Sequence, residues 1–202
     1  MKKYNYPLFQ PKLGNLTENI KNQYLNDTIR IGKLNESCLK DERINSLVAS
    51  NDLKDEIYFW QLYSILGEKP VHDLIENFYT KVFNDTEADW FREEFIETGT
   101  IKYHIRGQKK FWLDIMGGGE MYKGGELKLY KKHKLVEDIM TLEGATRWMM
   151  FMNETLKEMR FFNINDKRII KCIKKFLYFF MKKYSVQFDF NFLEFIKTQS
   201  KL

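Results

Sequence analysis

The fold is decided by one stretch, residues 100–115, which reads TIKYHIRGQKKFWLDI. Thr100 is a residue type that caps the N-terminus of a helix. After it, one set of side chains falls on a single helical face: His104, Gln108, Phe111, Trp112 and Ile115. This spacing predicts a helix on which two polar side chains share a stripe with large apolar ones.

Two longer helical patterns precede this stretch. Asp52 is a suitable cap for the first, whose apolar residues run to Gly67, a residue type that commonly ends helices. The second begins at Pro70, which the first turn of a helix tolerates, and its apolar positions continue to Phe83. We therefore expect two helices before the central one, separated by a break near Gly67.

A shorter pattern fills the space between Phe83 and Thr100. Residues 85–95 read DTEADWFREEF, with Asp85 or Thr86 as the expected cap. On the other side of the central helix, residues 117–125 read GGGEMYKGG, and their five glycines cannot support a stable helix. The sequence predicts a short helix before residue 100 and a loop after residue 116.

Two more helical patterns follow, over residues 141–161 and 166–184. The second carries apolar residues on one face and seven Lys or Arg residues on the other, which is typical of a helix with one solvated face. The expected fold is therefore all-α, with one domain over residues 51–190. Residues 1–50 are rich in breakers and poor in periodicity, so we expect an N-terminal extension with a short helix near 39–48, and residues 191–202 form a C-terminal tail.

Composition excludes several classes of function. The 202 residues include 17 Phe, 11 Tyr and 4 Trp, which favours helices around an aromatic core. The net charge of +5 comes from charges of both signs along the whole chain, so we expect no nucleic-acid partner. Cys38 and Cys172 match no metal-binding spacing, which indicates reduced thiols. Without a membrane-length apolar segment or a signal peptide, we expect a cytoplasmic protein that does not bind membranes.

Two catalytic alternatives receive little support. A zinc site built on His72, His104 and His133 would need a carboxylate to complete it, and the sequence contains no HxxxH or HExxH pair. A Ser-His-Asp triad would need a strand pattern and a GxSxG turn, which are also lacking.

The segment from Trp60 to Met152 resembles the group II truncated haemoglobins, whose fold is a two-over-two helical globin. The likeness rests on five motifs that occur in the family's order: LYSILG, NFYTKVFNDTEADWFREEF, QKKFWLDIMGGGEMY, LKLYKKH and ATRWMMFM. The resemblance therefore implies a truncated globin fold with an N-terminal extension, and haem b as the cofactor.

The resemblance also implies a set of cofactor contacts. Carried over residue by residue, they are His133, Tyr79, Phe95, His104, Gln108, Phe111, Trp148, Lys132, Tyr122 and Val136. His133 corresponds to the iron ligand, and a neutral imidazole is what a ferrous haem needs on one side. His104 occupies a position where the family usually has a small residue or Thr, so its imidazole is a second candidate iron ligand when no gas is bound. Lys132 is a candidate partner of a haem propionate.

On the opposite face, the resemblance implies hydrogen-bond donors for a bound gas. Tyr79 and Trp148 are the expected donors, with Gln108 above the ligand beside His104. Phe95 corresponds to the aromatic residue that clamps the haem edge, and Phe111 shields the haem. A ligand crowded by donors leaves slowly, because each hydrogen bond contributes about 1 kcal/mol.

We therefore expect a haem-binding globin that takes up O2, NO and CO, with NO dioxygenase or peroxidase-like activity more in keeping with this pocket than oxygen delivery. Such activity needs a reductase. The sequence identifies neither this reductase nor the oligomeric state of the protein. One alternative is a haem-based sensor or interaction module that acts through residues 1–50. Another is a haem-free globin-like domain, because Lys132 stands where the family has Arg and Leu135-Val136 where it has Pro-Phe.

Overall fold

The computed structural model describes residues 9–123, 130–131, 134, 136–159 and 166–199. Over these residues the regular secondary structure is helical, with no strand, and an isolated β-bridge joins Lys12 to Gly118. The predicted all-α class is therefore confirmed.

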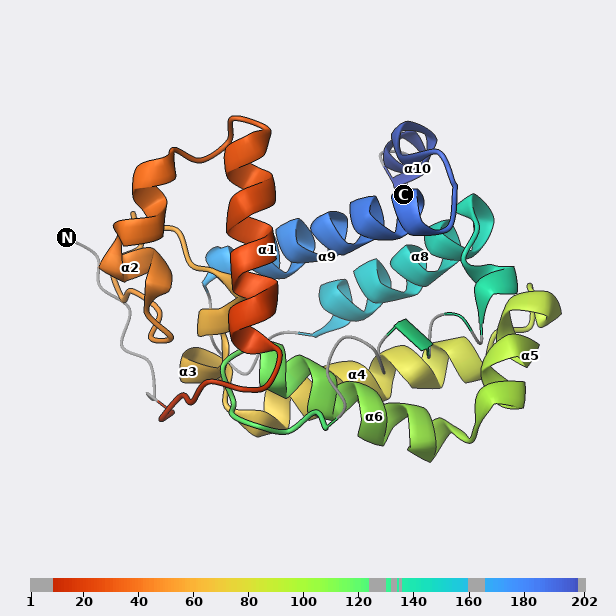
Figure 1. Ribbon diagram of the computed structural model, residues 1–202. Coiled ribbons are helices and arrows are strands. Elements are labelled where there is room, and N and C mark those ends of the chain that lie inside the picture. Colours follow the sequence, from red (N-terminus) through yellow and green to blue (C-terminus); the bar gives the residue numbers. More distant parts are fainter. Residues whose placement is uncertain (1–8, 124–129, 132–133, 135, 160–165, 200–202) are drawn as a thin grey trace.

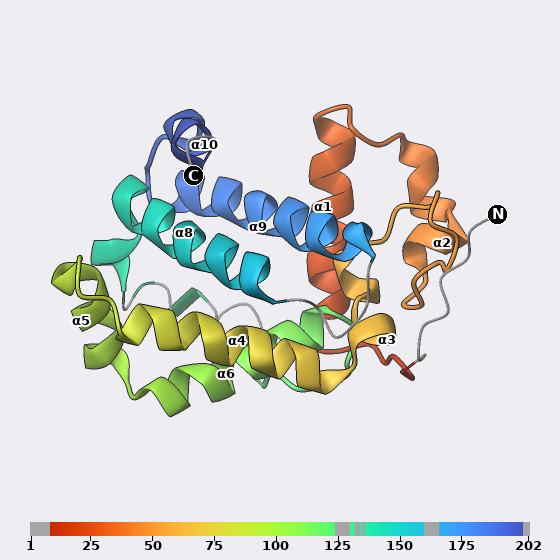
Figure 2. The same ribbon diagram turned by 180° about the vertical axis from the view of Figure 1, so that it is seen from behind.

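Four helices form the body of the molecule in two layers (Figure 1). In the lower layer, α4 (Glu68–Phe83) packs along α6 (Ile101–Ile115), and the short α5 (Asp89–Thr98) connects them at one end. In the upper layer, α8 (Leu142–Glu158) and α9 (Lys167–Gln187) run side by side above them, as both views show (Figures 1 and 2). This is the two-over-two arrangement that the sequence predicts.

The helix ends follow the expected local chemistry at several places. The hydroxyl of Thr100 accepts a hydrogen bond from the backbone N–H of Tyr103 and caps α6, and Thr141 caps α8 in the same way. Gly67 separates α3 (Tyr63–Leu66) from α4 with φ of 63°, a conformation that favours glycine. Pro70 lies in the first turn of α4, as predicted.

The first predicted helix is wrong in its N-terminal half. Residues 51–58 are not helical, and helical structure begins with the short η2 (Phe59–Gln61). Asp52 accepts a hydrogen bond from the N–H of Lys54 in a local turn, and the Gln61 side chain accepts one from the extended Tyr58. These side-chain bonds replace the backbone bonds that a helix over residues 52–58 would need.

Other predicted boundaries also shift. The short helix α5 begins at Asp89 and not after Asp85, whose carboxylate accepts a hydrogen bond from the N–H of Glu87 and is also bound by Arg147 of α8. Helix α8 ends at Glu158, before the predicted residue 161, and α9 continues to Gln187. A short η3 (Glu137–Ile139) precedes α8.

The N-terminal extension contains a helix that its sequence did not predict. Helix α1 (Thr17–Arg30) is followed by η1 (Glu36–Lys40) and α2 (Glu42–Asn45), which fall near the short helix expected at 39–48. Leu16 and Ile20 belong to the main hydrophobic core, and Leu25 is fully buried in a second cluster with Trp60. The extension is therefore packed against the helices of the main body.

One buried carboxylate joins the extension to the central helix. Asp114, at the end of α6, has no exposed surface and accepts hydrogen bonds from the backbone N–H groups of Asn15, Leu16 and Tyr122 at 3.2, 2.8 and 3.1 Å. Gly14 lies so close that a Cβ there would stand 2.1 Å from the Asp114 carboxylate. This close approach explains the glycine and fixes the start of α1 on α6.

The predicted C-terminal tail also forms a helix. Helix α10 (Phe192–Gln199) packs against α8 and buries Phe195 completely. The eight residues are too few for periodicity alone to predict a helix, and tertiary packing supplies the missing stability. None of the described helices is both long enough and apolar enough to cross a membrane.

Candidate functional site

A cavity of about 180 Å³ lies between the two helical layers. Its walls are mainly aromatic and come from α4, α5, α6, α8 and α9. The lining includes eight residues that the sequence assigned to the site: Tyr79, Phe95, His104, Gln108, Phe111, Tyr122, Val136 and Trp148. The fold thus brings together side chains from residues 79 to 148 around one apolar space.

The remaining two predicted contacts, Lys132 and the expected iron ligand His133, lie outside the described residues. Their assignments stay predictions. Of the residues near them, Tyr130, Lys131 and Lys134 are described and exposed.

Tyr79 provides a hydroxyl to the cavity from α4. Its side chain is almost completely buried, and this burial raises the pKa of Tyr79 above its ordinary value. The hydroxyl therefore stays protonated at neutral pH and can donate a hydrogen bond. Among the described residues, it has no hydrogen-bond partner.

Gln108 of α6 and Trp148 of α8 line the same cavity from two other sides. The Trp148 ring packs against Phe78, with ring centroids 4.9 Å apart, so the indole is held in place. Neither the Gln108 amide nor the Trp148 indole N–H forms a hydrogen bond within the described part of the chain. Both side chains are partly buried, so these groups remain available to donate to a small ligand in the cavity.

His104 is held differently. Its Nε2 lies 2.8 Å from the backbone carbonyl oxygen of Phe95, and its ring stacks on Tyr79 with centroids 5.3 Å apart. A carbonyl only accepts hydrogen bonds, so Nε2 carries the proton and donates it. His104 thus braces Tyr79 and the end of α5, and coordination of iron through Nε2 would require the bond to Phe95 to break.

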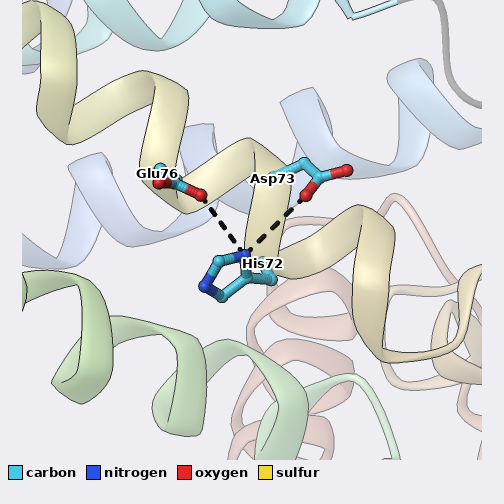
Figure 3. A group of neighbouring side chains, drawn as sticks. All are labelled: His72, Asp73 and Glu76. Atoms are coloured by element: carbon cyan, nitrogen blue, oxygen red, sulfur yellow. Dashed lines mark ion pairs between the residues drawn. The ribbon is translucent and has the colours of Figure 1, made fainter.

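The other described histidine, His72, lies on the surface of α4. Figure 3 shows His72 beside Asp73 and Glu76, with Nδ1 at 3.7 Å from the Asp73 carboxylate and 3.5 Å from that of Glu76. The donor atoms lie within 4.8 Å of one another but come from one partly exposed helical turn, an ordinary arrangement for ion pairs along a helix. In the described structure, no cluster of potential metal ligands includes His72 and His104 together.

The contacts predicted from the sequence include no residue of α9. This helix contributes a band of aromatic and apolar side chains to the cavity: Phe176, Leu177, Phe180, Met181 and Tyr184. Their helical spacing did predict an inward-facing stripe for Phe176, Leu177 and Phe180, but it could not distinguish cavity lining from solid core.

A buried ion pair joins the lower helical layer to the upper one. The buried Asp85, which follows α4, is bound by Arg147 of α8 through two hydrogen bonds of 2.5 Å. Burial alone would raise the pKa of Asp85, but the hydrogen bonds and charge of Arg147 lower it overall. Asp85 and Arg147 are therefore both charged, and their ion pair links the two layers.

Comparison with known proteins identifies the class. The sequence profile of the bacterial-like globins matches residues 61–181, more than half of the chain, and the chain belongs to this family. The match covers the helices that frame the cavity, from α3 to most of α9. Membership of a globin family implies a haem cofactor.

Two plant proteins refine this assignment. The chain is 30% identical over 117 residues to two-on-two hemoglobin-3 of Arabidopsis thaliana, covering 57% of this chain and 63% of the relative. It is 29% identical over 117 residues to group 2 truncated hemoglobin 3-1 of Lotus japonicus, covering 57% and 66%. The chain thus spans a little under two thirds of each relative. These similarities confirm the predicted relationship to the group II truncated globins.

The residues around the cavity fit a haem in their chemistry. Aromatic walls suit a flat apolar macrocycle, and the uncharged donors suit a small ligand on one of its faces. The volume is below the roughly 300–1,000 Å³ usual for sites of larger ligands, so uptake of a haem requires the lining side chains to move apart.

Proposed function

We propose that this protein binds haem b in the cavity between its two helical layers and, through it, the diatomic gases O2, NO and CO. The observation that carries this proposal is the group of three donors, Tyr79, Gln108 and Trp148, that line an apolar cavity with no hydrogen-bond partner in the described structure. The family's implied cofactor supports the same reading.

His133 is the proposed iron ligand. The chain has three histidines, and the other two are engaged: His72 in ion pairs on the surface of α4 and His104 with the Phe95 carbonyl. When bound, haem supplies an iron atom with one position for an imidazole and one for a gas.

The three donors determine how tightly the protein holds that gas. Bound O2 carries partial negative charge, and each donor stabilises it by about 1 kcal/mol, or roughly fivefold in affinity. Three independent donors therefore slow release by about a hundredfold. Such retention suits reaction with NO or peroxide, supported by an electron-donating partner protein, better than oxygen delivery.

His104 has a positioning role in this proposal. Its ring stacks on Tyr79 while Nε2 donates to Phe95, so it keeps the Tyr79 hydroxyl directed at the ligand. Coordination of iron by His104 stays a separate prediction, and it would require both contacts to be given up.

Titration of the purified protein with haemin tests the proposal. We expect a Soret band with one haem per chain, and loss or strong alteration of this band in His133→Ala. His72→Ala is the matched control, because His72 lies on the surface of α4 outside the cavity lining, and it should bind haemin like the wild type. Failure of the wild type to retain haemin, with native helicity and stability, would instead support a haem-free globin-like domain.

A second candidate function is a haem-based sensor. The Asp114 contacts join α1 of the extension directly to α6, which carries His104 and Gln108, so a change at the cavity has a short structural path to the extension. Hydrogen exchange over residues 17–30 should then differ between the ferrous protein with and without CO. Equal exchange in the two states would argue against sensing through the extension.

A further inference from the structure

The surface of the molecule carries a groove of about 1,200 Å³ along α9, separate from the cavity. Figure 1 shows α1 and α10 rising on the same side of α9, one toward each end, and the reverse view in Figure 2 agrees. Residues of all three helices line the groove. Helices α1 and α10 lie outside residues 61–181, the segment that matches the globin family.

Part of the groove lining is apolar. It combines aromatic and aliphatic side chains: Tyr24, Ile31, Leu34, Tyr58, Ile170, Tyr178, Phe179, Val186, Phe192 and Ile196. Three of the aliphatic residues are open to solvent, with exposed fractions of 45% for Ile31, 82% for Val186 and 37% for Ile196. Exposed aliphatic side chains gathered in one groove mark an interaction site.

The rest of the groove lining is strongly basic. Eight cationic side chains contribute to it: Arg30, Lys33, Lys167, Lys171, Lys174, Lys175, Lys182 and Lys183. Against them stand two acidic residues, Asp27 and Glu56. Eight minus two leaves a formal charge of +6 around the groove, whereas the whole chain carries +5. The basic excess of the protein is therefore concentrated here.

Most of these charges lack a partner within the chain. Arg30 pairs with Asp27, Lys175 pairs with Glu56, and Lys183 bonds to Gln23. The other five lysines have no ion pair among the described residues: Lys33, Lys167, Lys171, Lys174 and Lys182. Like charges crowded along one groove repel one another, and an acidic partner would relieve this repulsion.

We infer that this groove docks an acidic amphipathic helix of a partner protein. The apolar lining matches the apolar stripe of such a helix, in the way that grooves receive helical segments. The basic residues of α9, with Arg30 and Lys33 at the end of α1, match Asp and Glu residues on the polar side of the helix, which sets orientation and speeds association.

Other basic-surface partners fit less well. Single-stranded nucleic acid needs open ring faces on which bases stack. Here Tyr58 stacks on Trp60 at 5.0 Å, and Tyr24 packs edge-on against Trp60 and Phe179 at 5.8 and 5.1 Å, so neighbouring rings occupy these faces. An anionic membrane favours an apolar face that can lie flat on it, whereas this surface is hollow.

A synthetic peptide provides the probe. We would use a fluorescein-labelled helix of about 18 residues, with Leu at helical spacing on one face and Glu on the other, against the full-length protein. Anisotropy should rise on binding, and the affinity should fall with increasing salt. A peptide of the same composition with Leu and Glu scrambled should bind at least about tenfold more weakly, because it has no apolar stripe.

Two sets of variants locate the binding site. Lys171→Glu with Lys182→Glu reverses two exposed charges of the groove lining and should weaken peptide binding at least about tenfold, whereas Lys102→Glu with Lys110→Glu makes the same charge change on α6 and should have less than about twofold effect. Val186→Asp places a negative charge among the apolar lining residues and should weaken binding about fivefold.

Leu193 gives the control for Val186. It is 72% exposed on α10 but does not line the groove, so Leu193→Asp should leave binding unchanged. Thermal unfolding of each variant confirms that its fold is intact.

Three outcomes would overturn the inference. Equal binding of the ordered and scrambled peptides would reduce the groove to a non-specific basic patch. Tighter binding of single-stranded DNA or of phosphatidylserine vesicles, with the same dependence on Lys171 and Lys182, would assign the surface to another class of partner. Equal effects of the groove and α6 variants would place binding elsewhere. None of these results depends on haem.

Discussion

Two hollows of the described structure are opposite in design. The cavity between the layers is apolar with a few uncharged donors in its lining, whereas the groove along α9 combines apolar side chains with many lysines. Uncharged donors in an apolar lining suit a small ligand with partial charge, because their hydrogen bonds strengthen where water is excluded. Exposed lysines suit a large anionic partner and respond to salt. The same helix, α9, serves both hollows with its two faces.

Removal of the Asp114 carboxylate should have the largest effect, and it should impair peptide binding in the groove while haemin uptake in the cavity persists. Asp114→Ala leaves three backbone N–H groups without their acceptor, so we expect a loss of about 4 kcal/mol in the free energy of unfolding, measured by urea denaturation. The groove should lose its α1 wall and bind the acidic peptide weakly, while haemin uptake persists. Asp52→Ala, which removes one exposed turn contact, is the control and should cost less than about 1 kcal/mol. A loss of haemin uptake with peptide binding intact would contradict this separation.

Arg147→Ala should weaken the contact between the two helical layers. It leaves Asp85, whose side chain is 2% exposed, as an unpaired buried charge, so we expect a destabilisation of about 3 kcal/mol in urea denaturation. Lys81→Ala removes a more exposed ion pair that also joins α4 to α8, the Lys81–Glu158 pair at 2.7 Å, and should cost less than about 1 kcal/mol. Similar losses in both variants would show that the burial of the Asp85–Arg147 pair has no special role.

Single donor substitutions should have smaller, kinetic effects. Tyr79→Phe and Trp148→Phe each remove one donor from the cavity, and each should speed O2 dissociation roughly fivefold by stopped-flow absorbance. Tyr63→Phe removes a hydroxyl on α3, outside the cavity lining, and it is the matched control, with O2 dissociation expected to stay as in the wild type. Unchanged dissociation in both donor variants would mean that these groups do not reach the gas.

The smallest expected effect concerns acid stability. Because the folded state lowers the pKa of Asp85, the stabilisation from this group is fully present above the ordinary carboxyl pKa of about 4 and is lost as the pH falls through the lower folded value. Asp85→Asn removes this titration, so its unfolding free energy should depend less steeply on pH below about 4 than that of the wild type. Parallel pH profiles would contradict the assignment.

The two hollows also differ in how far the sequence predicts them. The sequence predicts the cavity from helical stripes within α4, α6 and α8 and from the family resemblance. Tyr79, Gln108 and Trp148 are predicted site residues, and all three line the cavity. The groove was not predicted. The lysines of α9 indicated a solvated face, and their neighbour α1 buries polar residues such as Lys21 and Thr28, which hides its periodicity.

Long-range contacts explain the remaining misses. The start of α1 depends on Asp114, which lies almost one hundred residues away in the sequence, and α10 is stabilised by burial of Phe195 against the body of the molecule. Asp85 suited a helix cap locally and does accept a bond from the N–H of Glu87, but it is also bound by Arg147, 62 residues further along. Local patterns do not contain such partners. His133 as iron ligand stays a prediction from the resemblance.

The central claim is that Tyr79, Gln108 and Trp148 face a gas bound to haem in the cavity. Infrared spectroscopy of the ferrous carbonyl form tests it most directly, because hydrogen-bond donors near CO lower its stretching frequency. We predict that the triple variant Tyr79→Phe, Gln108→Leu, Trp148→Phe binds CO with a band at clearly higher frequency than the wild type. An identical band in the two proteins, or no CO complex in the wild type, would contradict the claim.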